Sequence, residues 1–237
     1  GVTVGIGDAG QLERAFERAK EFGPKVVVEQ LAVGHDFRVL VVNGRFVAAA
    51  HRVPAQVVGD GQHTIDELVA AENRNPRRGH GHENVMTMLQ VAKVTEELLA
   101  ERGDGVDTVR PPGEAFSLER TANLSTGGSA EDVTAKVHTA NKFLVERVAR
   151  ILGLDVCGID IVAPTLESPI VGNGGMVIEV NAAPGLRMHL SPSVGKARNV
   201  AAPIVDMLFP VGAEHDIPIV SVTGTNGKTT TVRLVNH

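Results

Sequence analysis

Three oxygen-bearing side chains in the second half of the chain could hold a metal ion. Asp160 lies in the apolar run GIDIV, and Glu179 and Asn181 lie in the apolar run VIEVN, so both runs are typical of strands. A carboxylate buried there without a partner would destabilise the fold, so something must neutralise it. Glu179 and Asn181 are two residues apart and point to the same face of a strand. Carboxylate and amide oxygens suit Mg²⁺, so the pattern predicts a metal site, and the alternative is a strand with one salt-bridged acid.

The last stretch of the chain, IVSVTGTNGKTTTVRLVNH, could bind a phosphate. An apolar run, a glycine-bearing turn and the start of a helix follow one another over residues 219–237. In such a loop, backbone N–H groups and the helix N-terminus meet the anion while lysine adds a charge. The common phosphate-binding loop would place glycine where this chain has Val222, and the alternative is a glycine turn after a strand. We predict nucleotide contacts from Gly224, Asn226, Gly227 and Lys228, with Lys228 at the β- and γ-phosphates and Thr229 at a Mg²⁺.

Composition limits the class of protein. The 237 residues are 43% hydrophobic and 22% charged, which is ordinary for a soluble globular chain with a sizeable core. The net charge of −5 argues against a nucleic-acid partner, and the single cysteine, Cys157, excludes an internal disulfide and fits a small buried filler. No apolar run is long enough to span a membrane and no signal peptide is present, so we expect a cytoplasmic location. The chain lacks an initiator methionine, and we expect it to be part of a longer protein.

The elements that position these residues follow from periodicity and turn signals. Asn43-Gly44 between two β-rich runs predicts a hairpin, and Thr64 with Glu67 predicts a capping box at the start of a helix. Two runs at 155–164 and 175–185 are expected to form paired strands. The class is α+β with a prominent antiparallel sheet. The other expected elements are a helix over 11–22 ended by Gly23-Pro24, a short buried strand over 25–30, and helices over 84–101, 134–152 (stopped by Gly153) and 195–208.

Several of these motifs together resemble a known family. GLDVCGIDIV followed by VIEVNAAPG is similar to the metal-binding half of an ATP-grasp ligase, and RTANLSTGG (120–128) is similar to ATP-grasp enzymes that extend peptides. With HRVPAQVVGDG, RGHGHE, EVNAAPGLRMHLSPSVG and TGTNGKTTT, the chain resembles the cyanophycin synthetases, in which a Mur-ligase-like module follows an ATP-grasp module. The resemblance implies an ATP-grasp domain over 1–209 truncated at its N-terminus, a linker over 210–217, and the strand, loop and helix that begin a Mur-ligase-like domain over 218–237.

The resemblance also implies roles for individual residues. Glu29 and Gln30 match the hinge whose backbone contacts adenine, and Asp36 matches the acid that binds the ribose. Asp160, Glu179 and Asn181 match the Mg²⁺ ligands, with Glu179 bridging two ions. Arg120 and Asn123 match catalytic polar residues near the phosphates and the acceptor carboxylate. Ser125, Gly127 and Gly128 match substrate contacts, and His82 is a weaker candidate at the acceptor end, with a solvent-facing loop histidine as its alternative.

The implied activity is ATP-dependent ligation. ATP would phosphorylate the terminal carboxylate of a polyaspartate chain, aspartate would attack the acyl phosphate, and the Mur-like module would attach arginine to side chains. The implied partners are aspartate, arginine and the cyanophycin polymer, with a homo-oligomer as the full-length enzyme. The alternatives are another ATP-grasp peptide ligase, of the D-alanine–D-alanine or ribosomal-protein-modifying type, or a nucleotide-binding fragment without turnover. We interpret RNPRR (74–78) as mostly a solvated turn, with Arg77 or Arg78 available to a polyanion.

Overall fold

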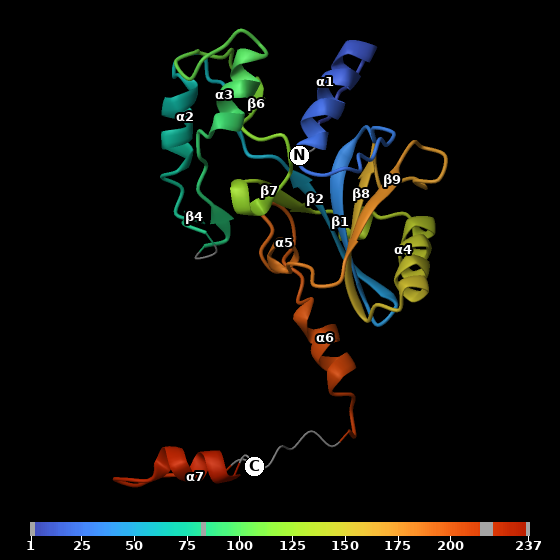
Figure 1. The fold of residues 1–237 in the computed structure, drawn as a ribbon, viewed down its shortest axis with the longest axis vertical. Helices are drawn as coiled ribbons and strands as arrows, with labels where there is room; N and C mark the ends of the chain where they lie inside the picture. The colour runs from blue at the N-terminus through green and yellow to red at the C-terminus, as the bar shows by residue number, and fades with distance from the viewer. Residues whose placement is uncertain (1–2, 82–83, 214–219, 236–237) are drawn as a thin grey trace.

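A five-stranded antiparallel sheet forms the centre of the protein. The computed structural model describes residues 3–81, 84–213 and 220–235. The strand order is β7-β2-β1-β8-β9, formed by Ser129–Asp132, Arg45–Val53, His35–Val42, Val156–Ala163 and Met176–Asn181. Helices lie on both sides of this sheet, as Figure 1 shows. The prediction of an α+β class with a prominent antiparallel sheet is therefore confirmed.

The hairpin predicted at Asn43-Gly44 joins β1 and β2. Asn43 has φ 49° and Gly44 has φ 67°, the left-handed values that a two-residue turn between twisted strands requires. The turn sets the register in which Asp36 lies opposite Arg52. β8 pairs with β1 along its whole length and places Asp160 opposite Arg38, and β9 on the outer side places Glu179 opposite Asp160. The hairpin turn, the pairing of β8 with β1 and the pairing of β9 with β8 together bring charged residues from four strands into neighbouring positions.

One face of the sheet is covered by α4 (Thr139–Leu152). Phe37, Val39, Ile159 and Ile161 point to this face and form a buried cluster with residues of the helix. The helix begins later than the predicted residue 134, because residues 134–136 form a separate 3₁₀ turn. Gly153 ends it in the left-handed conformation, φ 65°, as predicted. Cys157 is fully buried in the same cluster, which fits a small filler, and burial raises the pKa of its thiol.

The opposite face of the sheet changes character along the strands. At one end, Leu40, Val42 and Ala48 pack against Val200 and the side chains of α6 (Ala201–Leu208). At the other end the same face carries Asp36, Arg38, Arg52 and Asp160. Alternate residues of a strand share a face, so the charged residues lie on the same face of their strands as the hydrophobic residues at the other end. The short helix α5 (Arg187–Leu190) lies on this side and contacts β2 and β7.

A separate lobe is inserted between two neighbouring strands of the sheet. β2 leaves the sheet at Val53 and the chain returns at Ser129, its direct partner in β7. The intervening residues have their own core, which includes Ile65, Leu99 and Phe116. Figure 1 shows the lobe beside the sheet, with α4 on the far side. The lobe contains β3 (Gln56–Val58), α2 (Ile65–Glu72), β4 (Arg78–Gly79), β5 (Met86–Thr87), α3 (Lys93–Ala100), β6 (Ala115–Ser117) and a 3₁₀ turn at Leu124–Thr126.

Some predicted elements are wrong in extent or type. The capping box of Thr64 and Glu67 is present at the start of α2, and the first helix, α1, spans Ala9–Lys20. Residues 25–30, however, form no strand and leave Val27 77% exposed, since no described strand pairs with them. The expected helix over 84–101 is confined to α3, because β5 occupies its first part. The expected helix over 195–208 begins only at Ala201.

The C-terminal part of the chain lies apart from the sheet in Figure 1. The helix α7 (Lys228–Val235) follows the glycine-bearing loop as predicted, but residues 220–223 do not form the predicted strand, as no described strand pairs with them. The predicted linker over 210–217 and the domain start at 218 fall partly on residues 214–219, which lie outside the described part. None of the helices in the described residues is both long and apolar enough for a transmembrane span.

Candidate functional site

Asp160 is the centre of the polar face. It is only 6% exposed, yet both of its carboxylate oxygens have cationic partners. Arg38 donates from Nε to Oδ1 and from Nη2 to Oδ2, the latter at 2.9 Å, and Arg52 donates from Nη2 to Oδ2 at 3.1 Å. Two guanidinium groups from β1 and β2 therefore neutralise the buried carboxylate. Forked contacts of this kind fix orientation as well as charge.

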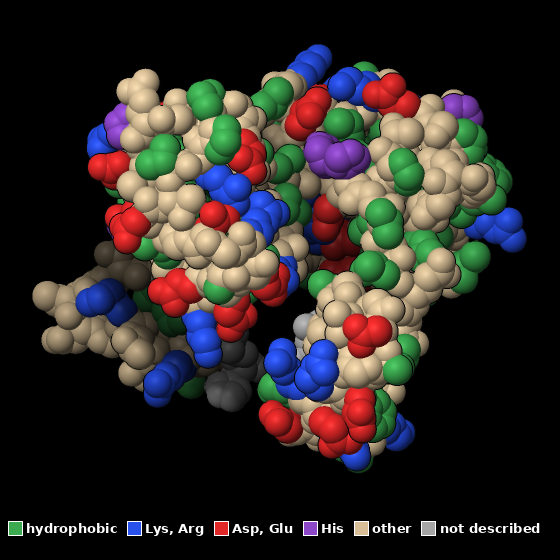
Figure 2. Space-filling view, turned by 90° about the horizontal axis from the view of Figure 1, so that it is seen from above, with side chains coloured by type: hydrophobic (Ala, Val, Ile, Leu, Met, Phe, Trp, Pro, Cys, Tyr) green, Lys and Arg blue, Asp and Glu red, His purple; other side chains and the backbone are tan. Residues whose placement is uncertain are grey.

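A second carboxylate extends this ion-pair row. Arg52 donates from Nε to Oδ1 of Asp36 at 2.6 Å, so Arg52 bridges Asp36 and Asp160. Burial raises the pKa of Asp36, and this effect outweighs the opposing influence of Arg52. The ion-pair row Asp36–Arg52–Asp160–Arg38 contains equal numbers of both charges. Figure 2 shows acidic and basic side chains together at the bottom of the hollow between the lobe and the sheet.

Glu179 and Asn181 lie beside the ion-pair row on the edge strand β9. Glu179 is exposed, and its Oε1 accepts a hydrogen bond of 2.9 Å from Nδ2 of Asn181. Across the strands Glu179 is the direct partner of Asp160. All three side chains offer the oxygen atoms that Mg²⁺ prefers as ligands. The carboxylate of Asp160 has about four lone-pair sites, and the hydrogen bonds from Arg38 and Arg52 do not occupy all of them, so the three residues fit Mg²⁺. Within the described residues, no group of three or more His, Cys, Asp or Glu side chains is arranged to hold a metal ion.

A buried histidine lies next to the ion-pair row. His189 of α5 is 2% exposed, and its Nε2 has no hydrogen-bond partner. Burial, together with the nearby charge of Arg38, lowers the pKa of His189 to about 4, although the charge of Asp132 opposes the shift. Burial alone would raise the pKa of Asp132, but hydrogen bonds from Arg198 and Thr134 outweigh it and leave that pKa lowered. The sequence analysis missed His189, because a histidine in LRMHL has no spacing that signals burial.

The loop before β7 carries four of the predicted site residues. Asn123 caps the 3₁₀ turn by accepting a hydrogen bond of 3.1 Å from the N–H of Ser125, and both residues are exposed. Gly127 is buried with φ 95°, and a side chain on Gly128 would meet the carbonyl oxygen of Val53 at 2.9 Å. Glycine is therefore required at both positions. Arg120 instead pairs with Glu101 after α3, at 2.5 Å, and does not belong to the ion-pair row.

The other predicted nucleotide contacts lie away from the ion-pair row. Glu29 and Gln30 are exposed in the irregular segment before β1. In the C-terminal loop, Lys228 donates from Nζ to the carbonyl oxygens of Gly224 at 2.5 Å and Thr225 at 3.4 Å. Lys228 thus folds back on its own loop, which also includes Asn226, Gly227 and the exposed Thr229 at the start of α7. His82 lies outside the described residues.

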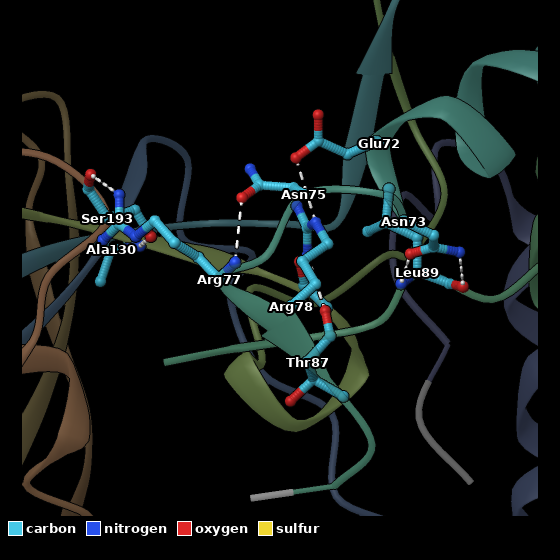
Figure 3. A network of polar contacts seen from close by, with 10 residues as sticks. Glu72, Asn73, Asn75, Arg77, Arg78, Thr87, Leu89, Ala130 and Ser193 are labelled. Atoms are coloured by element: carbon cyan, nitrogen blue, oxygen red, sulfur yellow. Dashed lines mark hydrogen bonds and ion pairs between the residues drawn. The ribbon is translucent and has the colours of Figure 1, made fainter. Parts of the chain in front are cut away.

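The interpretation of residues 74–78 as a solvated turn is wrong for Arg78. This residue is buried and donates to Glu72, Thr87 and Gly127, as Figure 3 shows in part. Arg77 donates to the carbonyl oxygens of Ser193 and Pro192 at 3.1 and 3.0 Å. Arg38 and Arg52 are likewise held by carboxylates. Arginines that composition alone would assign to an anionic polymer are largely occupied by contacts within the fold.

Comparisons with known proteins agree with this architecture. A family model described as a RimK-like ATP-grasp domain matches residues 115–208. Cyanophycin synthetase from Crocosphaera subtropica is 49% identical over 239 aligned residues, covering 100% of this chain and 27% of that protein. The glutathione biosynthesis bifunctional protein GshAB from Mannheimia succiniciproducens is 36% identical, over 87% of this chain and 28% of that protein. A crystal structure of a bifunctional glutathione synthetase from Pasteurella multocida aligns with TM-score 0.67 and 33% identity, over 87% of this chain and 28% of that chain.

These matches confirm the predicted fold and the predicted resemblance. The antiparallel sheet with its packed helices is an ATP-grasp fold. The chain spans only about a quarter of the length of the curated relatives it matches, 26–28%. Cyanophycin synthetases from Synechocystis and Geminocystis herdmanii are each 48% identical over the whole chain. Over its whole length the chain is therefore similar to one segment of the cyanophycin synthetases, and its residues 115–208 match a RimK-like ATP-grasp domain.

Proposed function

We propose that this chain is the ATP-grasp part of an ATP-dependent ligase that builds cyanophycin. The observation that carries the proposal is the buried Asp160 with Glu179 and Asn181 beside it, on a sheet whose whole sequence aligns with cyanophycin synthetases. Buried charges next to a hollow are a costly arrangement that active sites commonly contain. The cyanophycin synthetase alignment covers 100% of this chain, whereas the alignments with the glutathione biosynthesis proteins cover 84–89% of it. The fuller coverage favours the cyanophycin substrate class.

Each part of the site has an assigned task in this proposal. The backbone at Glu29 and Gln30 would contact adenine, and Asp36 would accept hydrogen bonds from the ribose. Asp160, Glu179 and Asn181 would hold Mg²⁺, in one or two ions, and the bound metal would supply positive charge at the transferring phosphoryl group. The ion pairs of Asp160 with Arg38 and Arg52 support this assignment, because they fix the carboxylate before any ligand binds.

The proposed reaction has two steps. A terminal carboxylate oxygen of the polyaspartate acceptor attacks the γ-phosphorus of ATP, and ADP leaves. The amine of aspartate then attacks the acyl carbon, a peptide bond forms, and inorganic phosphate departs with the electron pair of the broken C–O bond. Asn123 and Ser125 lie exposed on the loop that ends at Gly127 and Gly128, where they could bind the acceptor carboxylate. Arg120 would have to leave Glu101 to take part.

The loop Gly224–Thr229 would serve a second nucleotide in a Mur-ligase-like module. That module would attach arginine to the aspartate side chains, so aspartate, arginine and the polymer are the proposed partners. A cytoplasmic location and a homo-oligomeric full-length enzyme belong to the same proposal. The second candidate function is a different ATP-grasp ligase, which the likeness to glutathione-forming proteins favours.

Replacing Glu179 by alanine tests the proposal most directly. We expect Glu179→Ala to reduce aspartate-dependent ADP release from the full-length gene product by at least about 100-fold, since one charge-stabilising group at a phosphoryl transfer contributes roughly 10²–10³ in rate. Folding should survive, because Glu179 is exposed on an edge strand. The measurement is ADP release with ATP, Mg²⁺, an aspartate-rich primer and aspartate.

Asp206→Ala is the matched control, because Asp206 is also an exposed carboxylate and lies on α6. It should leave the rate unchanged. Normal turnover by Glu179→Ala would refute the metal assignment. If the unmodified protein released ADP with γ-glutamylcysteine and glycine but not with the aspartate primer, the second candidate function would replace the first.

A further inference from the structure

The strongest feature outside the ion-pair row is an arginine pair that links the lobe to the sheet. Arg78 is the first residue of β4 and Arg77 directly precedes it, and their side chains leave in opposite directions in Figure 3. Such divergence is expected of successive residues on an extended chain. Arg77 reaches the backbone at Pro192 and Ser193, and Ser193 itself pairs with Ala130 of β7 at 2.8 Å. Arg78 reaches in the other direction, into the lobe.

Arg78 joins three separate segments through one guanidinium group. Its Nε donates to Oε1 of Glu72 at 3.0 Å, and its Nη1 donates to the carbonyl oxygens of Thr87 at 2.7 Å and Gly127 at 3.2 Å. The side chain is 5% exposed, whereas the carboxylate of Glu72 is 40% exposed. A buried guanidinium whose only counter-ion is a partly exposed acid destabilises the fold unless its N–H groups also find hydrogen-bond acceptors. The carbonyl oxygens of Thr87 and Gly127 are these acceptors.

The loop at Gly127 is seated on the segment that Arg78 holds. A side chain on Gly127 would come within 2.8 Å of Cδ2 of Leu89, and Leu89 is clamped by Asn73 in both directions, at 2.8 and 2.9 Å. Asn73 directly follows Glu72 at the end of α2. The end of α2 thus fixes both Arg78 and the surface beneath Gly127. Among the described residues, the hydrogen bonds of Asn123 and Ser125 stay within their own turn.

We propose that Arg78 is a positioning residue that sets the placement of the loop 123–128 over the sheet. The proposal rests on the proposed function, in which this loop contacts the acceptor. Arg78 touches no substrate and acts through the carbonyl oxygen of Gly127. Lysine in its place would keep the charge but lose the fork that serves three acceptors at once. The acceptor would then meet a loosely placed loop, while the nucleotide residues on β1, β8 and β9 would be unaffected.

The test compares Arg78→Lys with Arg110→Lys in the full-length gene product. Arg110 also lies in the lobe, but its two ion pairs, with Asp104 and Glu114, do not involve the loop 123–128. We expect Arg78→Lys to raise the KM for the aspartate primer by about 10- to 100-fold, since a misplacement of about 1 Å can cost up to about 10²-fold, and to leave the KM for ATP unchanged. Arg110→Lys should change neither KM.

Hydrogen exchange of residues 123–128 provides a second readout that does not need activity. The amides of Gly127 and Gly128 donate to Leu124 and Asn123, and we expect them to exchange faster in Arg78→Lys than in Arg110→Lys. Glu72→Gln, which keeps both carbonyl contacts of Arg78, should leave the loop protected. Unchanged protection in Arg78→Lys, or equal increases in both KM values, would overturn the proposal. If the unmodified protein released no ADP with the primer, the proposed function would fail, and exchange alone would decide whether Arg78 anchors the loop.

Discussion

At the scale of single residues, the site is built by burying charges in pairs. Asp160 and Arg38 are 6% and 8% exposed, and each would be costly alone. The register of β1, β2 and β8 places Asp36 opposite Arg52 and Arg38 opposite Asp160. Charged groups that the fold already holds in place do not have to reorient during a reaction. Such preorganisation is expected at a site where negative charge develops in the transition state. His189 is the exception in this region, because its ring is buried without a partner for Nε2.

The pH dependence of stability should report on His189. Burial lowers its pKa from 6.5 to about 4, so between these two values the unfolded chain binds a proton that the folded chain does not. The stabilisation is complete above pH 6.5 and is lost as the pH falls towards 4. The difference corresponds to roughly 3 kcal/mol. We therefore expect His189→Leu, which cannot titrate, to flatten the fall in the free energy of unfolding measured by urea denaturation between pH 7 and pH 4.

His63→Gln is the control for this experiment. Hydrogen bonding to Asp60 raises the pKa of the exposed His63, so its contribution has the opposite sign and disappears as the pH rises. His63→Gln should therefore leave the acid-side fall in stability in place or make it steeper. If His189→Leu lost stability with falling pH as steeply as the unmodified protein, the buried state of His189 would not be the cause.

At the scale of elements, the hairpin at Asn43-Gly44 determines how the charges meet. It aligns Asp36 with Arg52, and any other register would move Arg52 relative to Asp160. The turn depends on left-handed backbone at both residues, which a β-branched side chain adopts only with strain. The hairpin therefore offers a way to perturb stability without changing any group of the site.

Gly44→Val should destabilise the protein by about 1–2 kcal/mol, the usual cost of a left-handed conformation for a residue with a side chain. Gly44 has φ 67°, whereas Gly23 has no left-handed φ and no atom within 4 Å of an added Cβ. Gly23→Ala is accordingly the control and should cost much less. Urea denaturation of both variants provides the measurement. Equal stability of Gly44→Val and the unmodified protein would mean that the turn does not set the register.

The same elements show what can be predicted from a sequence. The hairpin, the capping box of α2, the end of α4 at Gly153, and the strands around Asp160 and Glu179 were predicted, because their signals lie within a few neighbouring residues. The ion pair of Arg38 with Asp160 was not, since the two are 122 positions apart and only the register joins them. Residues 25–30 and 220–223 have strand-like composition but no described partner, and β-propensity alone does not make a strand. The burial of Arg78 depends on how the lobe folds back, which no local pattern reports.

At the scale of the whole molecule, the ion-pair row and the C-terminal loop form two separate candidate nucleotide sites. α7 lies away from the sheet in Figure 1, and the hydrogen bonds of Lys228 remain within its own loop. In the proposed function, Asp36 of the ion-pair row would bind the ribose, and Asp160 with the neighbouring Glu179 and Asn181 would hold Mg²⁺. If the two sites act independently, each should support one chemical step with its own ATP, and damage to one should leave the other step intact.

Replacing Lys228 by alanine in the full-length gene product tests this independence. The side chain would contribute one positive charge at the β- and γ-phosphates, and its loss should reduce arginine attachment by roughly 10²–10³ in rate. Aspartate addition should continue normally, because Asp160, Glu179 and Asn181 are unchanged. The assay follows ADP release with primers ready for each step, with aspartate or arginine supplied separately. Arg233→Ala, another exposed cation on α7, should affect neither step. Equal loss of both steps in Lys228→Ala would show one shared nucleotide site, because two independent sites cannot both depend on a lysine that reaches only one of them.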